Sequence, residues 1–380
     1  MKVRQVFFWL HLSAGTCAGI VIFIMSVTGV LLTYERQMAE WADLRAYRIV
    51  RPHDGAERLA VEDVLERVQQ QEPKAQLASV TVRAGDAPIT VALGPRTLFV
   101  NPYDGTIMGE GAPGVRAFFR RVRDWHRWLG VNGEGRNGAR AITGASNLVF
   151  LFIVCSGFYL WWPRTWTWRQ VRSVIWFRGN LRARQRDFNW HNTAGFWCCV
   201  PLVIVVASAT VISYRWSSDL VYRVAGEEPP RAAPPAAAAG ARGGGVRTEG
   251  IDDLLQRGQR QVPDWRTLSV RIPRADDKTA TLTIDQGSGG EPHKRSSMVL
   301  DFRSGKQEWE PFSAQSDGRR WRSLLRFAHT GEAGGLVGQT VAGIASAGGA
   351  LLVWTGISLA IRRFLSWRRA RPRVADERAA

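Results

Sequence analysis

Hydrophobic and polar positions divide the chain into long apolar stretches that alternate with polar, arginine-rich or Pro/Gly-rich ones. A bilayer core about 30 Å thick requires about 20 apolar residues in a helix, and four stretches meet this requirement. Apart from cysteines and terminal tyrosines, their only ionisable side chains are two histidines. We therefore predict four membrane-spanning helices, at about 6–33, 141–162, 191–214 and 336–361. The first is too long for the core of a signal peptide, so we expect it to stay in the mature protein.

The two long polar segments between the spans have the pattern of small α+β domains. Helical apolar spacing at 59–70 is followed by strand-like alternation at 77–83, 89–93 and 97–101 and by a turn at 102–105. The second segment repeats this order, with a helix at 251–261 and strands at 268–272, 280–285 and 297–302. Residues 231–245, rich in Pro, Ala and Gly, are typical of a flexible linker. The pattern predicts a membrane α-helical fold, a four-helix transmembrane bundle with two α+β domains outside the membrane.

Lysine and arginine in the short loops predict the orientation, because long domains are translocated largely regardless of charge. The N-terminus carries Lys2 and Arg4, the loop at 164–190 carries seven arginines, and the tail at 362–380 is also rich in arginine. We expect these parts to be cytoplasmic and the long segments to lie together on the other side, although arginines at 120–127 and 319–326 oppose this assignment. The predicted organisation is a first span (1–34), an outer α+β domain (35–120), an interfacial segment with the second span (121–163), the arginine-rich loop (164–190), the third span (191–214), a second outer domain with the linker (215–320), an interfacial segment with the fourth span (321–361) and the tail (362–380).

An internal repeat relates the two halves of the chain. A shift of 180 residues places His11-Leu12-Ser13-Ala14-Gly15 on His191-Asn192-Thr193-Ala194-Gly195, and Thr28 on Ser208, without a gap. A shift of about 200 aligns 100–105 with 300–305, and Ser156-Gly157 corresponds to Thr355-Gly356. The chain is therefore predicted to be a duplication of one unit, which consists of a span, an outer domain and a second span.

Four of the six histidines occupy repeat-related positions. His11 and His191 lie near the cytoplasmic ends of spans one and three, and His126 and His329 precede spans two and four on the outer side. Each is followed four residues later by a small residue, which on a helix lies one turn away on the same face. We expect this arrangement to leave a bare surface beside each imidazole, against which a flat porphyrin can lie. The four small residues are Gly15, Gly195, Gly130 and Ala333.

These four histidines have two interpretations. Each can be a polar residue satisfied between helices, or the four can bind metal or haem, because ionisable residues inside a membrane are costly and point to function. Structural zinc usually requires four ligands at one place, whereas each membrane face offers two histidines. Two bis-histidine haems (heme b), one held by His11 and His191 and one by His126 and His329, fit this number, and their filled axial positions favour electron transfer. His53 and His293 lie in polar sequence and are expected to be solvated.

Charge and composition favour a membrane over a nucleic-acid partner. The net charge of +18 suits either, but 17 tryptophans and the apolar stretches point to the bilayer, and no nucleic acid is expected. Tryptophans near the outer histidines can line a haem or anchor the interface, and arginines there can pair with haem propionates or with lipid head groups. Cys17, Cys155, Cys198 and Cys199 lie in apolar stretches without a CxxC pair and are interpreted as small core residues.

Several short motifs resemble those of the PepSY-associated transmembrane family, and the resemblance covers nearly the whole chain. The long segments resemble PepSY modules, most clearly at Phe99-Val100-Asn101-Pro102-Tyr103-Asp104-Gly105. The fourth span departs from the pattern, since Ala360-Ile361-Arg362-Arg363 replaces a Trp-Trp-Pro ending. The motifs are Phe8-Trp9-Leu10-His11 with Gly15 and Thr28-Gly29, Trp125-His126-Arg127-Trp128-Leu129-Gly130, Ser156-Gly157-Phe158-Tyr159-Leu160-Trp161-Trp162-Pro163-Arg164, and Trp190-His191-Asn192.

Within this family, the length and the two-module layout are most similar to the inner-membrane ferric-siderophore reductases of the ferrioxamine reductase type. The resemblance implies an enzyme of the bacterial inner membrane with two periplasmic PepSY-like domains. Such an enzyme passes electrons from a cytoplasmic or membrane donor, which the sequence does not identify, through two haems to a ferric siderophore, with the hydroxamate type favoured. Reduction yields Fe(II), which hard oxygen ligands hold less tightly than Fe(III).

Two other functions remain open from the sequence. One is a membrane-anchored PepSY interaction protein in which the histidines are structural. The other is a transporter for iron or a siderophore, although a parallel repeat with unbroken spans is less natural for transport. A nucleotide-dependent activity is not expected, because the sequence contains no Rossmann or P-loop motif.

Overall fold

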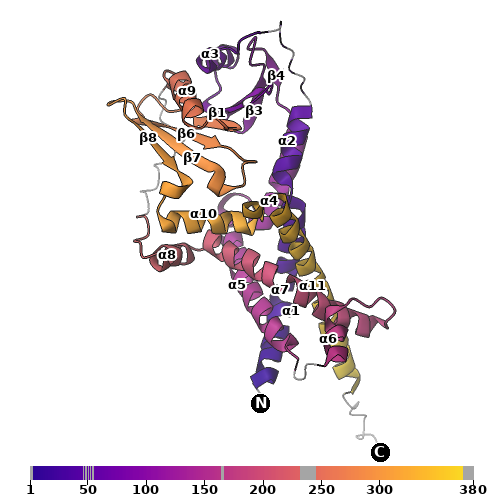
Figure 1. Cartoon of the computed structure of the whole chain (residues 1–380). Helices are drawn as coiled ribbons and strands as arrows, with labels where there is room; N and C mark the ends of the chain where they lie inside the picture. The colour runs from indigo at the N-terminus through magenta and orange to yellow at the C-terminus, as the bar shows by residue number, and fades with distance from the viewer. Residues whose placement is uncertain are drawn as a thin grey trace, which may run out of the picture. The chain divides into compact units, whose positions relative to one another are not determined.

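The computed structural model describes residues 3–45, 47, 49, 51, 53, 55–163, 167–231 and 245–370. Most of the predicted linker at 231–245, Arg164 and the tail beyond residue 370 lie outside the described residues. The chain forms two compact units (Figure 1). The membrane unit comprises Met1–Thr33, Arg120–Ser217 and Ala328–Ala380, and the sheet unit comprises Tyr34–Phe119 and Ser218–Phe327.

Four long helices form the membrane unit, and each is long and apolar enough to cross a bilayer. They coincide with the four predicted spans. Helix α7 begins at Ala183, eight residues before the predicted span, because the polar residues 183–190 are helical but are not hydrophobic enough to be counted as part of a span. The four are α1 (Val3–Leu32), α5 (Arg136–Trp161), α7 (Ala183–Ser213) and α11 (Gly335–Ala370).

The membrane helices pack in a ring, since α1 and α7 each contact both α5 and α11. Asn147 of α5 donates to the carbonyl of Val206 and to the hydroxyl of Thr210 on α7, both at 3.0 Å. Small residues allow close approach: a Cβ at Gly19 of α1 would lie 3.2 Å from Ile357 of α11. Close packing and interhelical hydrogen bonds of this kind drive helix association in a bilayer, where apolar burial alone does not.

Shorter helices connect these elements. Helices α4 and α10 precede α5 and α11 and are joined to them through short 3₁₀ turns. Helix α6 falls within the predicted arginine-rich loop and packs on α7. The short helices are α2 (Glu35–Arg45), α3 (Val61–Gln71), α4 (Pro113–Trp128), α6 (Trp168–Ile175), α8 (Arg215–Val224), α9 (Ile251–Gln261) and α10 (Asp317–His329), and the 3₁₀ turns are η1 (Gly133–Gly135), η2 (Pro292–Lys294), η3 (Phe312–Ala314) and η4 (Glu332–Gly334).

The sheet unit contains one eight-stranded antiparallel sheet of order β4-β3-β2-β1-β5-β6-β7-β8. Strands β1 and β5 join the two halves, with Val80 opposite Val270 and the hydroxyls of Thr81 and Ser269 3.0 Å apart. The expectation of two separate α+β domains is therefore corrected: the halves share one sheet. The pairing satisfies two strand edges that separate domains would leave open. The strands are β1 (Leu77–Arg83), β2 (Ile89–Leu93), β3 (Arg96–Val100), β4 (Ile107–Gly109), β5 (Thr267–Arg271), β6 (Thr279–Asp285), β7 (Arg295–Asp301) and β8 (Gln307–Pro311).

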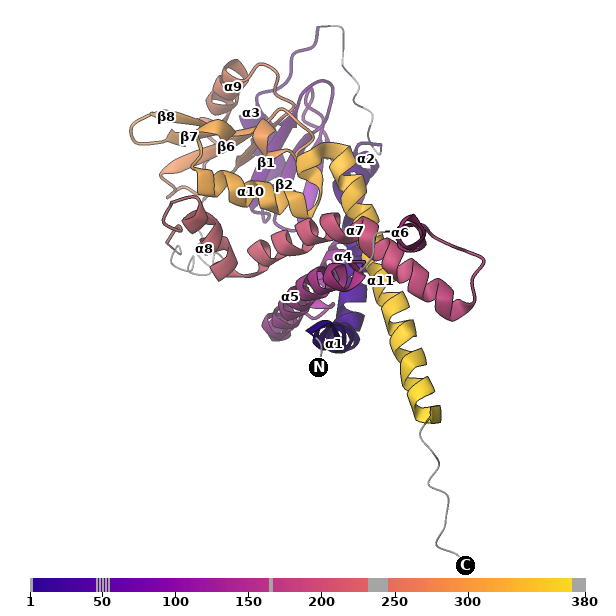
Figure 2. The same cartoon turned by 60° about the horizontal axis from the view of Figure 1, so that its bottom comes forward.

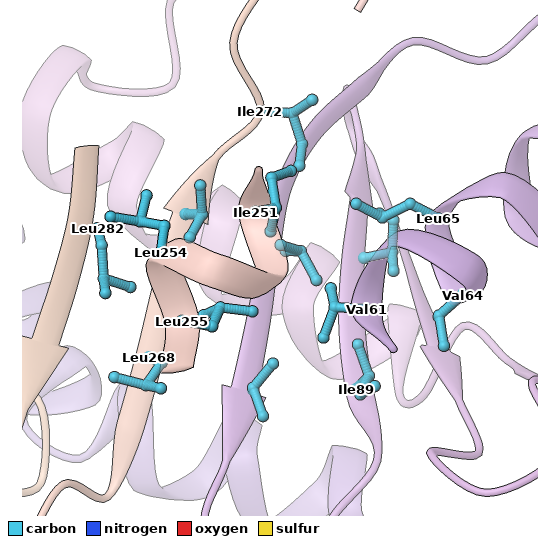
Figure 3. Packing of buried hydrophobic residues seen from close by; sticks show 14 of the residues in the cluster. Val61, Val64, Leu65, Ile89, Ile251, Leu254, Leu255, Leu268, Ile272 and Leu282 are labelled. Atoms are coloured by element: carbon cyan, nitrogen blue, oxygen red, sulfur yellow. The ribbon is translucent and has the colours of Figure 1, made fainter. Parts of the chain in front are cut away.

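Helices α3 and α9 cover the sheet and share one core (Figure 3). Leu65 of α3 and Leu254 of α9 are fully buried in it, together with inward-facing residues of both halves of the sheet. The two helices also cap each other: the carboxylate of Asp252 accepts from the backbone N–H groups of Val61 and Glu62 at 2.8 and 3.0 Å, and the carboxylate of Glu62 accepts from the N–H of Asp252 at 3.1 Å. A single core across both halves is consistent with one folding unit.

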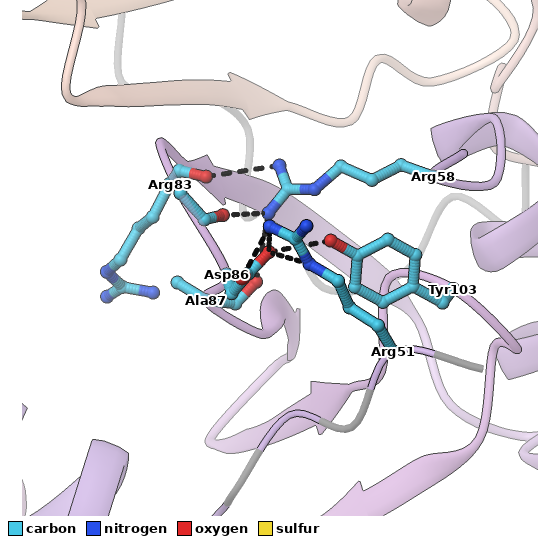
Figure 4. Close-up of polar contacts among 7 residues, drawn as sticks. Arg51, Arg58, Arg83, Asp86, Ala87 and Tyr103 are labelled. Atoms are coloured by element: carbon cyan, nitrogen blue, oxygen red, sulfur yellow. Dashed lines mark hydrogen bonds and ion pairs between the residues drawn. The ribbon is translucent and has the colours of Figure 1, made fainter. Parts of the chain in front are cut away.

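An ionic cluster ties the β1–β2 turn to the segments before and after it (Figure 4). Arg51 donates two hydrogen bonds to one carboxylate oxygen of Asp86, and the hydroxyl of Tyr103 donates to the same oxygen at 2.6 Å. Arg58 binds backbone carbonyls of the turn. Hydrogen bonds from Arg51 and Tyr103 hold the pKa of the Asp86 carboxyl below its usual value.

Candidate histidine centres

The structure brings the four repeat-related histidines together in two pairs, both within the membrane unit. The rings of His11 on α1 and His191 on α7 have centres 6.4 Å apart, with planes at 87°. The rings of His126 on α4 and His329 on α10 have centres 6.3 Å apart, with planes at 49°. These are the pairs expected from the repeat and from membrane depth. We call them the α1–α7 pair and the α4–α10 pair.

The hydrogen bonds of the α1–α7 pair favour one tautomer of each ring. Ser156 Oγ lies 2.9 Å from His11 Nδ1, and Thr355 Oγ1 lies 3.0 Å from His191 Nδ1. Each hydroxyl also donates to a carbonyl of the preceding turn in its own helix, at 3.2 and 2.7 Å. Because one hydroxyl proton cannot serve both bonds, we assign the ring Nδ1–H as the donor to the hydroxyl oxygen. Nε2 then carries the lone pair in both rings, as a metal ligand requires.

In the α4–α10 pair, His126 uses a hydroxyl acceptor like the first pair, whereas His329 uses a backbone carbonyl. Thr28 Oγ1 lies 2.9 Å from His126 Nδ1 and donates to a carbonyl of its own helix at 2.6 Å. His329 Nδ1 lies 2.9 Å from the backbone carbonyl oxygen of Val205, which can only accept. Ser208 is the repeat equivalent of Thr28, but its hydroxyl is used within α7. All four rings therefore have Nδ1–H bound to an acceptor.

A glycine beside each of three hydroxyls gives the imidazole room. A Cβ at Gly157 would lie 3.2 Å from His11 Cε1, and one at Gly356 would lie 3.3 Å from His191 Cε1. At Gly29 the corresponding distance to His126 Cε1 is 3.7 Å. The [Ser/Thr]-Gly dipeptide is thus a positioning unit for the histidines. The sequence analysis aligned Ser156-Gly157 with Thr355-Gly356 and noted Thr28-Gly29 only as a family motif, and it assigned none of the three a role, although their recurrence could have indicated one.

The small residues four positions after the histidines are only partly arranged as expected. Gly15 and Gly195 lie on α1 and α7 one turn after their histidines, and nothing packs within 4 Å of a Cβ at Gly15. For the other pair the expectation is wrong. Helix α4 ends at Trp128, so Gly130 lies in a left-handed turn against Trp125, and Ala333 lies in η4 after α10 has ended at His329. The i+4 rule fails there because the helix does not continue.

The ring separations are close to the separation expected for two imidazoles that share one metal ion. An imidazole nitrogen binds a metal at about 2.0 Å and lies about 1.2 Å from its ring centre. Two rings whose nitrogens pointed at one metal along a single line would therefore have centres about 6.3 Å apart. The observed values of 6.4 and 6.3 Å match this figure. No cluster of three or more His, Cys, Asp or Glu suited to a metal occurs in the described part of the chain.

The two centres lie far apart along the membrane helices. Thr28, which binds His126, follows His11 by 17 residues on α1, or about 25 Å of helix. This length approaches the hydrocarbon thickness of about 30 Å. The arrangement thus places one pair of nitrogen donors towards each end of the bundle.

Side chains near the centres divide between packing and exposure. Trp161 stacks on Phe196 with ring centres 4.7 Å apart, whereas Trp125 and Trp321 are about half exposed. Arg319 forms an ion pair with Glu310 at 2.7 Å, and Arg322 donates to Ser218 at 2.8 Å. These contacts with protein groups weaken the expectation that the two arginines hold haem propionates.

Comparison with known proteins places the chain in a family. The pattern of the PepSY-associated TM region matches residues 8–363, which is nearly the whole chain and includes all four paired histidines. No curated protein matches the sequence significantly. The four membrane helices, the antiparallel sheet and this match together support a multi-pass membrane protein. The chain belongs to the PepSY-associated transmembrane family.

Proposed function

We propose that the protein is a di-haem b electron-transfer enzyme that reduces ferric siderophores. The observation that carries this proposal is the pairing of the histidines: two pairs of rings have centres 6.4 and 6.3 Å apart, and every ring has Nδ1 within hydrogen-bond distance of an acceptor. Structural zinc usually requires four ligands at one place, whereas each pair supplies two histidines, which favours haem over zinc. Haem b, when bound, supplies reversible one-electron chemistry.

The protein's own residues supply the ligands and keep their orientation. His11 and His191 would hold one haem, and His126 and His329 would hold the other. The hydroxyl and carbonyl acceptors at Nδ1 keep each Nε2 unprotonated and increase its basicity as a ligand. Gly15 and Gly195, one turn after their histidines, would offer surface to the first haem.

The ferric siderophore is the proposed substrate, as in the ferrioxamine reductases that the chain resembles. One electron from a cytoplasmic or membrane donor reduces Fe(III) to Fe(II), and the oxygen ligands then release the iron more readily. We place the protein in the bacterial inner membrane with cytoplasmic termini, on the basis of the arginine-rich loop at 164–190. The sheet unit would then be periplasmic.

A redox spectrum with haem quantification tests the cofactor. We expect Soret and α bands and two haems per chain. His11→Ala or His191→Ala should remove the same half of the absorbance, and His126→Ala or His329→Ala the other half. A colourless protein, or full haem content in all four variants, would contradict the proposal and favour a PepSY interaction protein or a transporter.

Vesicles containing the chemically reduced protein test the substrate. Addition of a ferric hydroxamate should reoxidise the protein and release Fe(II) to a ferrous chelator, and His126→Ala should abolish the release. If the protein stays reduced with every ferric hydroxamate but is reoxidised by another acceptor, the siderophore assignment is wrong and electron transfer stands. Reporter fusions after residues 75 and 175 test orientation, and an outside signal at 175 would reverse it.

A further inference from the structure

Helix α6 is held against α7 by a set of side-chain hydrogen bonds. Asn189, which is buried, donates to the carbonyls of Ser173 and Trp176 at 2.9 and 3.0 Å and accepts from the N–H of Arg178 at 2.8 Å. The indole of Trp197 donates to the carbonyl of Ile175 at 2.9 Å. These bonds satisfy the C-terminal carbonyls of α6 and fix its position on α7.

Helix α6 and the turn after it carry exposed aromatic side chains. Trp168, Trp176 and Phe177 are 69%, 56% and 55% exposed, and the neighbouring Trp197 on the membrane helix α7 is 60% exposed. Helix α6 packs beside α7, so it stays close to the end of the bundle (Figure 1 and Figure 2). Trp197 lies beside the end of α6, because its indole binds the Ile175 carbonyl.

The charge of this segment suits an anionic surface. Residues 162–186 contain seven arginines and no acidic residue, and Arg172 and Arg178 are exposed on α6 and on the turn after it. A basic helix with exposed aromatic residues is typical of a membrane interface, where anionic lipids attract arginine. An acidic protein partner would explain the charge but not the exposed aromatic residues.

We propose that α6 and the turn to Arg178 lie in the membrane interface and bind the phosphate groups of anionic lipids. Trp168, Trp176 and Phe177 occupy the boundary between head groups and acyl chains. Arg172 and Arg178 contact the lipid phosphates. This role is independent of haem and of siderophore reduction.

Hydrogen exchange of the full-length protein in nanodiscs tests the location. Amides of residues 168–178 should exchange more slowly in discs that contain phosphatidylglycerol than in phosphatidylcholine discs. The variant R172Q/R178Q should lose this difference. The control R271Q/R303Q removes the same charge from exposed positions of the sheet unit and should keep it. Equal exchange in both lipids, or a difference that survives in R172Q/R178Q, would overturn the proposal.

Native mass spectrometry gives a second measurement. Titration with phosphatidylglycerol should show an association constant about fivefold lower for each arginine removed. High salt should weaken the wild-type preference for phosphatidylglycerol over phosphatidylcholine, because screening acts on an exposed charge. Salt-insensitive retention would overturn the proposal even if R172Q/R178Q fails to fold.

Discussion

Replacing Thr355 by Ala tests whether the hydroxyl groups position the histidines. Thr355 is 1% exposed, so water cannot replace the acceptor that His191 Nδ1–H loses. A buried donor left unsatisfied costs about 1–3 kcal/mol, whereas interhelical hydrogen bonds in membranes average about 0.6 kcal/mol. Loss of such a supporting partner typically weakens metal binding about 10- to 100-fold. We expect about tenfold faster haem loss from the α1–α7 pair, with the fold retained.

Haem transfer to excess apomyoglobin measures this rate, and thermal unfolding checks the fold. Thr355→Ser keeps the hydroxyl and should behave like the wild type. Ser208→Ala is the control for the α1–α7 pair, because the Ser208 hydroxyl donates to carbonyls of α7, including the Val205 carbonyl at the α4–α10 pair, and has no hydrogen bond to His11 or His191. If Thr355→Ala loses haem no faster than either control, the hydroxyl does not position His191 and the reasoning is refuted.

Three further predictions concern other contacts. Gly157→Ala should displace the imidazole of His11 and lower haem occupancy, which the haem absorption spectrum measures. Gly138→Ala, whose Cβ would enter open space, should leave that spectrum unchanged. Val270→Ala, at a fully buried position where the halves of the sheet join, should cost about 2 kcal/mol of stability in thermal unfolding, and an unchanged melting temperature would contradict the shared core. Arg51 lowers the pKa of Asp86, so the ionised carboxylate stabilises the wild type relative to Asp86→Asn. This stabilisation should be fully present above pH 3.8, the ordinary pKa, and should be lost as the pH falls through the lowered pKa. Thermal unfolding of both proteins between pH 7 and pH 3 measures this difference, and a pH-independent difference would argue against the Arg51 contact.

Local periodicity was sufficient to locate most elements. The strands at 77–83 and 89–93 and the helix at 251–261 have the bounds that alternation and helical spacing predict. The internal repeat also indicated which histidines belong together, because equivalent positions in a duplication lie at equivalent depths. These features depend on residues within one turn or a few strand positions of each other, so a linear pattern contains them.

Tertiary structure decided the features that depend on distant partners. The pairing of β1 with β5 joins segments nearly 190 residues apart, and no local pattern distinguishes it from two separate sheets. The end of α4 before Gly130 and the use of the Val205 carbonyl by His329 likewise follow from how the chain turns and packs. Alternation along a strand shows which residues are buried but not which neighbouring strand they pair with. The acceptor of a backbone or histidine N–H likewise depends on which distant segment packs beside it.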